Sequence, residues 1–150
     1  MATLSSDLIW QITRGKSSTL VKRSQSGGVQ LSRDPLNLRG SYSRKQEGLV
    51  NDKAIGVQAG ENGGVTLLTK KADKANSPAS SIQSTTFSRS RSNRKVYSSI
   101  VKATANRNYR ADLRRDAVAR ASAIRKSQKP VKDGKPAKLR GAKARAAASA

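Results

Sequence analysis

The pattern of apolar and polar residues changes from segment to segment along the chain. A cluster of apolar residues lies within 8–12 and follows Ser5, a residue type that caps helices, so we predict a short helix that ends near Gly15. Residues 18–22, with Leu20 and Val21 at the centre, and residues 29–31 predict two short strands that turn at the glycines between them. The beginning of the chain is therefore expected to hold one helix and one hairpin.

The middle of the chain contains a second pair of predicted strands. Residues 55–57 and 65–69 are rich in apolar side chains and flank a glycine-rich turn at 60–64. Residues 36–53 mix leucines with basic residues without a regular period, which predicts an irregular loop anchored by a few apolar side chains. Residues 71–93 are mostly serine, threonine, alanine and lysine, which predicts a polar linker along the surface.

Two helices are predicted in the C-terminal part. Apolar residues recur at helical spacing over 94–104, after residues that can cap a helix. A second helix has Asp112 in its first turn, apolar residues along one narrow face, and Pro130 as its stop. Residues 131–150 alternate Lys or Arg with Ala, Gly and Pro, which predicts a tail that builds no core of its own.

These elements predict an α+β fold. The expected structure is a small antiparallel β-sheet body with a short N-terminal helix, two C-terminal helices and an extended basic tail. We predict four parts: a β-rich body at 1–70, a polar linker at 71–93, a basic helical segment packed on the body at 94–130, and the tail at 131–150.

The charge of the chain is strongly positive and unevenly distributed. There are 31 Lys and Arg residues against 9 Asp and Glu, a net charge of +22, and residues 81–150 carry 19 of the basic residues but three of the acidic ones. Self-repulsion of this size opposes compaction unless a polyanion neutralises it. Nucleic acid is the expected partner, because neutralised phosphates release their condensed counterions.

The residue types offer little basis for catalysis. The chain has no Cys and no His, which excludes thiolate nucleophiles, disulfides and imidazole or thiolate metal sites. Asp112 and Asp116 are spaced to share one side of a helix, but the surrounding arginines favour capping and ion pairing over proton transfer. We therefore expect no enzyme activity, no cofactor and no small-molecule substrate. Apolar runs of four residues or fewer predict no membrane segment.

Clustered basic residues are the candidate RNA contacts. The planar guanidinium group of arginine binds phosphate oxygens in pairs and stacks on bases. Tyr42 and Phe87 lie in polar segments and are candidates for stacking on unpaired bases, whereas Trp10 is expected to anchor the core. The predicted RNA-binding residues are Lys22, Arg23, Arg39, Tyr42, Arg44, Lys45, Phe87, Arg89, Arg91, Arg94, Lys95, Arg107, Arg110, Arg114, Arg115, Arg120, Arg125, Lys126, Lys129, Lys132, Lys135, Lys138, Arg140, Lys143 and Arg145.

Three separate motifs follow one another in the chain. They are Leu8-Ile9-Trp10, Asp34-Pro35-Leu36-Asn37-Leu38, and Tyr109-Arg110 with Arg120-Ala121-Ser122-Ala123-Ile124. In this order they resemble the eukaryotic large-subunit ribosomal protein family numbered twenty-eight, over roughly residues 8–130. The resemblance implies an α+β body embedded in large-subunit ribosomal RNA, neighbouring large-subunit proteins as partners, a cytoplasmic location in the large ribosomal subunit, and assembly in the nucleolus.

Two other functions are open on the sequence. The Lys-Ala-Pro tail resembles that of linker histones, which favours a chromatin protein. The alternation of Arg and Ser over 88–92 favours an RNA-processing factor, and the N-terminal pattern is similar to that of a ribosome-assembly factor family. The affinity for structured ribosomal RNA, compared with that for duplex DNA at the same salt concentration, separates the ribosomal hypothesis from the chromatin hypothesis. Phosphorylation of Ser88, Ser90 and Ser92 in cells would favour the processing factor.

Overall fold

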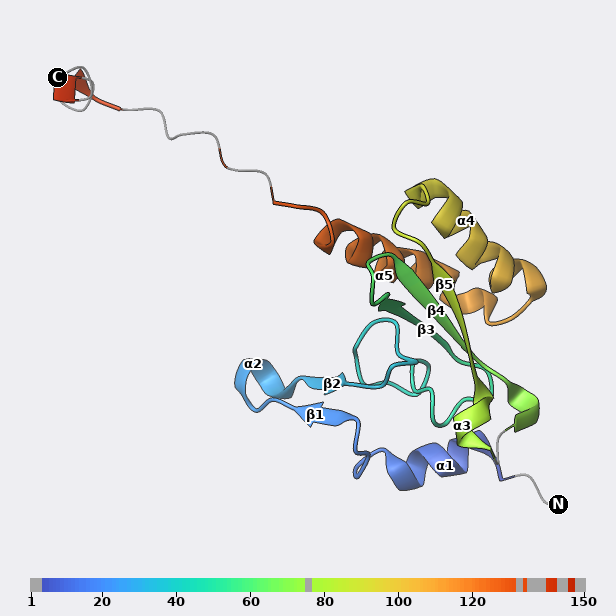
Figure 1. Cartoon of the computed structure of the whole chain (residues 1–150). Helices are drawn as coiled ribbons and strands as arrows, with labels where there is room; N and C mark the ends of the chain where they lie inside the picture. The colour runs from blue at the N-terminus through green and yellow to red at the C-terminus, as the bar shows by residue number, and fades with distance from the viewer. Residues whose placement is uncertain (1–3, 75–76, 132–133, 135–139, 143–145, 148–150) are drawn as a thin grey trace.

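Three antiparallel strands form the central sheet in the order β3-β4-β5. They are β3 (Ile55–Ala59), β4 (Val65–Lys70) and β5 (Ile82–Phe87). The computed structural model describes residues 4–74, 77–131, 134, 140–142 and 146–147 (Figure 1). The β3–β4 hairpin was predicted, and the register pairs Val57 with Leu67.

One face of this sheet supplies half of the hydrophobic core. Opposite residues in an antiparallel pair share a face. Val57, Leu67, Val65 and Phe87 therefore point to the same side, and each is almost fully buried. Ile55 completes this apolar face and has no exposed surface.

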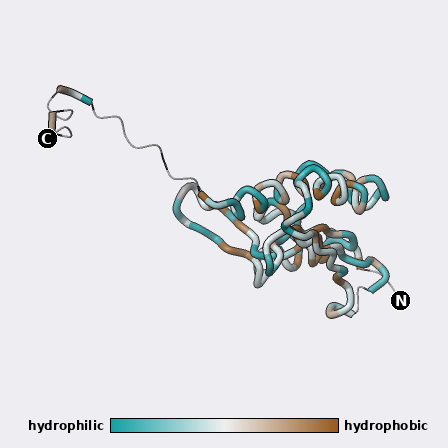
Figure 2. Tube along the Cα trace, turned by 45° about the horizontal axis from the view of Figure 1, so that its top comes forward, coloured by the Kyte–Doolittle hydropathy of each residue, from teal (hydrophilic) through white to brown (hydrophobic). Residues whose placement is uncertain are grey.

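Two helices cover this face and supply most of the rest of the core, to which Leu38 and Leu113 also belong. α4 (Asn93–Ala103) buries Val96 and Ile100, while α5 (Arg114–Ser127) buries Ala117 and Ala121. Along both helices apolar residues alternate with hydrophilic ones (Figure 2), so one stripe of each helix faces the sheet. The small alanines of α5 let that helix approach the sheet closely. Both helices were predicted from their period.

The N-terminal region has the predicted helix and hairpin. α1 (Ser6–Thr13) begins at Ser5, whose hydroxyl accepts a hydrogen bond from the Leu8 amide. The hairpin pairs β1 (Leu20–Lys22) with β2 (Gln30–Ser32) and projects from the sheet and helices (Figure 1). A short helical turn, α2 (Gln25–Gly28), makes the tip in place of the simple glycine turn.

The loop between the two hairpins is irregular, as predicted, and its apolar anchors are Leu36, Leu38 and Val50. The loop crosses the sheet at Gly56, where an added Cβ would lie 2.2 Å from the Pro35 carbonyl oxygen. Glycine at this position therefore allows the backbone of the loop to lie directly on β3.

The prediction of a polar linker over 71–93 is wrong at residues 82–87. Residues 82–87 form β5 and pair with β4 over six residues. They are preceded by two short turns, η1 (Ala72–Lys74) and α3 (Pro78–Ser81). The first five residues of β5 are exposed, so the apolar pattern that marks a strand is missing, and pairing with β4 decides the conformation.

Two short 3₁₀ turns, η2 (Ala105–Arg107) and η3 (Ala111–Leu113), connect α4 to α5, and Asp112 lies in the second of them. Beyond Pro130, the described alanines 142, 146 and 147 have helical backbone, which differs from the expected extended tail and fits the high helix propensity of alanine. Within the described ranges, no helix has the length and apolar character needed to cross a membrane.

Candidate nucleic-acid interface

A groove of about 690 Å³ lies between α4 and α5. Its lining includes four cationic side chains and no carboxylate. The groove residues are Arg94, Tyr97, Ser98, Val101, Lys102, Asn106, Arg114, Arg115, Val118 and Ala119. Because the stripes of both helices that face the sheet are apolar, the basic residues lie on the outer sides, where the helices meet the solvent. We call this surface the α4–α5 groove.

A second concave surface continues from this groove across α5. It shares Arg115 and Ala119 with the α4–α5 groove and adds Arg39 and Arg120. Its one carboxylate, Asp116, accepts a hydrogen bond from the Gln46 side chain at 3.0 Å. The basic surface thus extends from α4 over α5 to the loop at residue 39.

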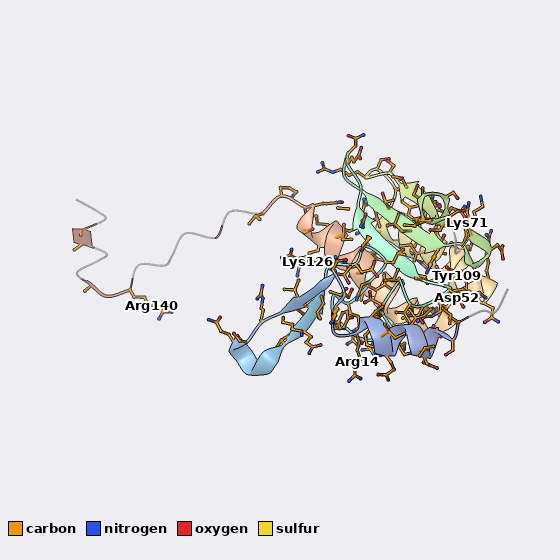
Figure 3. The ribbon with its side chains drawn as sticks, turned by 90° about the horizontal axis from the view of Figure 1, so that it is seen from below. Arg14, Asp52, Lys71, Tyr109, Lys126 and Arg140 are labelled. Atoms are coloured by element: carbon orange, nitrogen blue, oxygen red, sulfur yellow. The ribbon has the colours of Figure 1, made fainter. Side chains whose placement is uncertain are left out.

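Many predicted RNA-binding cations are exposed and donate no side-chain hydrogen bond within the described part of the chain. These side chains are available to an external anion. They are Lys22, Arg23, Arg39, Arg89, Arg94, Lys95, Arg107, Arg114, Arg115, Arg120, Lys126, Lys129 and Arg140. Figure 3 places Arg140 on the chain beyond the body.

Arg110 is engaged within the protein. Its guanidinium group donates to both carboxylate oxygens of Asp112 at 3.0 Å, and to the backbone carbonyls of Lys53 and Lys45 at 2.9 Å. The hydrogen bond from Arg110 holds the pKa of Asp112 below its ordinary value. Lys45 adds a longer ion pair to Asp112 at 3.7 Å. Arg110 therefore fastens the irregular loop to the start of α5 and is not free for the predicted RNA contact.

Arg125 and Arg44 are engaged in the same way. Arg125 donates to the Asn93 side chain at 2.7 Å and to the carbonyls of Arg89 and Arg91, so it holds the segment that presents those two arginines. Arg44 donates to Ser6 and Asp7 on α1, and to Asn51. Both were predicted to contact RNA, because intramolecular partners on distant segments leave no local signal in the sequence.

The aromatic side chains differ from expectation. Phe87 is 6% exposed and belongs to the core, so its predicted stacking on a base is wrong. The guanidinium of Arg91 lies 5.5 Å from its ring and donates to Ser99, which leaves Arg91 exposed but partly engaged. Phe87 ends a strand whose other residues are exposed and mostly polar, so no alternating apolar pattern indicates that its side chain points inward.

Trp10, in contrast to Phe87, does not join the main core. Its ring lies 5.1 Å from that of Tyr42, tilted by 35°, and both side chains are half-buried. Burial raises the pKa of the Tyr42 hydroxyl. The predicted core role of Trp10 is wrong, and Tyr42, predicted to stack on a base, already stacks on a protein ring.

Sequence reasoning missed several cations. Lys102 lines the α4–α5 groove, and its place eight residues after Arg94 on the same helix was the available signal. Arg14 is exposed at the end of α1 (Figure 3). Lys70 donates to three backbone carbonyls of the irregular loop, and burial lowers its pKa.

Five predicted contacts, Lys132, Lys135, Lys138, Lys143 and Arg145, lie outside the described residues. Within the described residues, no group of three or more acidic side chains is arranged to hold a metal ion, and the sequence has no Cys or His.

The chain is similar in sequence to a known protein family and to known proteins. The model of the Ribosomal L28e protein family matches residues 8–127. The large ribosomal subunit protein eL28 of Schizosaccharomyces pombe is 44% identical over 131 residues, which covers 87% of this chain and 97% of that protein. The eL28 protein of Dictyostelium discoideum is 41% identical over 57% of this chain and 61% of its own. These matches lead to one assignment: the chain belongs to the Ribosomal L28e protein family.

Proposed function

We propose that this protein is a structural, non-catalytic constituent of the large subunit of the cytosolic eukaryotic ribosome. Its relatives in Schizosaccharomyces pombe and Dictyostelium discoideum are named large ribosomal subunit proteins. Its partners are then large-subunit ribosomal RNA and neighbouring ribosomal proteins, and its assembly takes place in the nucleolus.

The observation that carries RNA binding is the continuous basic surface on α4 and α5. Four cations line the α4–α5 groove without a carboxylate among them, and Arg39 and Arg120 extend the surface across α5. Cations at fixed positions on a folded body neutralise phosphates and so reduce the repulsion between packed RNA segments. The sheet and its core fix where these cations are presented.

Sedimentation of a cell lysate through a sucrose gradient tests the ribosomal assignment. The protein is followed by immunoblot, with and without chelation of magnesium. We expect it to migrate with intact ribosomes in magnesium and with the separated large subunit after chelation. Migration at the top of the gradient, or with chromatin, would contradict the proposal.

The dependence of binding on salt tests the role of the basic surface. The full chain is titrated with a large-subunit RNA fragment at several salt concentrations. The triple variant Arg94→Gln, Arg114→Gln, Arg115→Gln should lower the magnitude of the log–log slope by about two to three. The matched triple Arg→Lys variant keeps the charge and should keep the slope. Equal slopes for the Gln variant and the unmodified chain would remove this surface from the RNA interface.

A further inference from the structure

We propose that the α4–α5 groove binds one unpaired nucleotide of RNA, with the base on its apolar floor and the flanking phosphates on its cationic rim. This inference rests on the proposed RNA-binding function and gives it a specific site. The groove between the helices has a free volume of about 690 Å³, which falls in the range of about 300–1,000 Å³ usual for small-ligand sites.

The floor of the groove is apolar although it faces solvent. Tyr97 and Val101 from α4, and Val118 from α5, are partly buried and line the groove together with Ala119. Tyr97 also packs against the core, so its ring is held in place from below. An aromatic ring fixed at the bottom of an apolar groove is a stacking platform for a base of any identity.

The rim of the groove is cationic. Arg94 lies in the first turn of α4 and Lys102 near its end, while Arg114 and Arg115 begin α5. None of these four side chains has an intramolecular hydrogen bond or ion pair within the described part of the chain. Cations from two helices thus surround one apolar floor, which matches the phosphates on either side of a single nucleotide.

Two polar side chains complete the site. Ser98 and Asn106 are exposed in the groove lining, and among the described residues neither side chain has a hydrogen-bond partner. Together they offer donors and acceptors to the edge of a base.

This combination favours an unpaired nucleotide over two other occupants. Duplex RNA presents phosphates to the rim but keeps its bases stacked, so the apolar floor would stay uncovered. An acidic amphipathic helix would match the rim and cover the floor, but its apolar face would leave the Ser98 hydroxyl and the Asn106 amide without partners. An unpaired nucleotide, by contrast, would cover the apolar floor with its base, pair its phosphates with the cationic rim and hydrogen-bond to Ser98 and Asn106.

A bulged RNA hairpin tests the inference on the full chain. The probe carries 2-aminopurine as its single bulged base, and the reference is the same hairpin fully paired. We expect the bulged hairpin to bind about fivefold or more tightly, the lower end of the gain from stacking one base on an aromatic ring. The 2-aminopurine fluorescence should fall on binding.

Two variants in the groove and one control variant on α5 test whether the preference for the bulged hairpin arises in the groove. Val118→Gln and Tyr97→Leu should reduce the preference for the bulged hairpin toward one, while affinity for the paired hairpin stays within twofold. Ser122→Gln, an exposed change two turns along from Arg115, should alter neither value. Val118→Gln leaves the core contacts of Tyr97 intact, so the test stands even if Tyr97→Leu fails to fold.

The outcomes separate the inference from the proposed function. Equal binding of both hairpins by the unmodified chain, with steep salt dependence, would overturn the nucleotide site and leave the ribosomal proposal standing. A preference for the bulge that survives both groove variants would also overturn it. Tighter binding of a synthetic acidic amphipathic peptide, lost in Val118→Gln, would assign the groove to a protein helix. Absence of binding to either hairpin would count against both proposals.

Discussion

The sheet–helix body and the N-terminal region are held together in different ways. The body, residues 54–130, buries a continuous core in which Ile55, Val65, Val96 and Ile100 have no exposed surface. The N-terminal region, residues 4–33, contains no buried side chain among those described. The body therefore has its own hydrophobic stabilisation, and the N-terminal region does not.

The junction between the two regions combines one aromatic contact, that of Trp10 with Tyr42, with several polar contacts. Arg44 on the irregular loop reaches Ser6 and Asp7 on α1, and the Thr19 hydroxyl donates to Glu47 at 3.4 Å. Polar contacts that are only partly buried contribute less net stability than a buried apolar core. Meanwhile α1 leaves Leu8 at 49% and Ile12 at 69% exposure. We infer that the position of the N-terminal region depends on few contacts within the free protein, whereas the core of the body fixes the basic surface.

The largest expected effect comes from matched apolar truncations in the two regions. Ile100→Ala removes a fully buried side chain and should lower the free energy of unfolding by about 2–5 kcal/mol. Ile12→Ala removes an exposed one and should change it by less than about 0.5 kcal/mol. Urea unfolding followed by circular dichroism measures both. Similar losses for the two variants would break the comparison.

Glycines with left-handed backbone give a second matched pair. A Cβ at Gly64, where φ is +88°, would lie 2.2 Å from the Phe87 carbonyl, whereas Gly27, with φ of +78°, has nothing within 4 Å. Both Ala variants carry the backbone cost of about 1–2 kcal/mol. Gly64→Ala should lose about 1–3 kcal/mol more, because the backbone of β5 must move. Thermal unfolding of both variants would show the difference, and equal midpoints would contradict it.

Arg110 tests how the irregular loop is joined to the body. Arg110→Ala removes hydrogen bonds to Asp112, Lys45 and Lys53 and should cost about 1.5–3 kcal/mol. Arg114→Ala removes an exposed arginine without an intramolecular partner among the described residues and should cost less than about 0.5 kcal/mol. Protection of loop amides from hydrogen exchange should fall in the first variant alone. Unchanged protection there would mean that the loop is held by its apolar anchors.

The smallest expected effect is a dependence of the folding stability on pH, which comes from Glu47 at the junction. Glu47 is 2% exposed and its Oε2 has no hydrogen-bond partner, so burial, reinforced by Asp34, raises its pKa. Because the folded pKa is above the unfolded one, the folded state binds the proton more tightly. The stability that this tighter proton binding gives to the folded state is fully present below the unfolded pKa and is lost as pH rises through the folded pKa.

Glu47→Gln removes that titration and keeps an acceptor for Thr19. Its urea midpoint should exceed that of the unmodified chain at neutral pH and approach it in acid, where the carboxyl of the unmodified chain is protonated. Midpoints measured from pH 4 to pH 8 check this. A parallel shift across the whole range would mean that the titration of Glu47 contributes nothing.

The elements that were predicted correctly have a local signal. α4 and α5 show helical spacing of apolar residues, and the β3–β4 hairpin combines apolar strands with the glycine turn at 60–64. β5 lacked such a signal, because five of its six side chains are exposed and its conformation depends on pairing with β4. Phe87 was misread for the same reason, since its direction follows from the strand that was missed.

The sequence predicted which region of the chain is rich in basic residues, but not how their side chains are arranged. The excess of basic residues after residue 80 marked the region of α4 and α5, and most of its arginines are exposed there. Arg44, Arg110 and Arg125 looked the same in sequence but bond to groups up to 65 positions away along the chain.

The sequence by itself determined the fold class, the helix and hairpin positions and the large positive charge, because these depend on residue type and on neighbours within a few positions. Only the tertiary structure decided which cations face outward, that Phe87 belongs to the core, and that Tyr97 and Val118 meet across one groove. These features depend on long-range pairing and packing, in which the partner of each side chain lies on a distant segment. For that reason the groove between α4 and α5 has no counterpart in any local pattern of the chain.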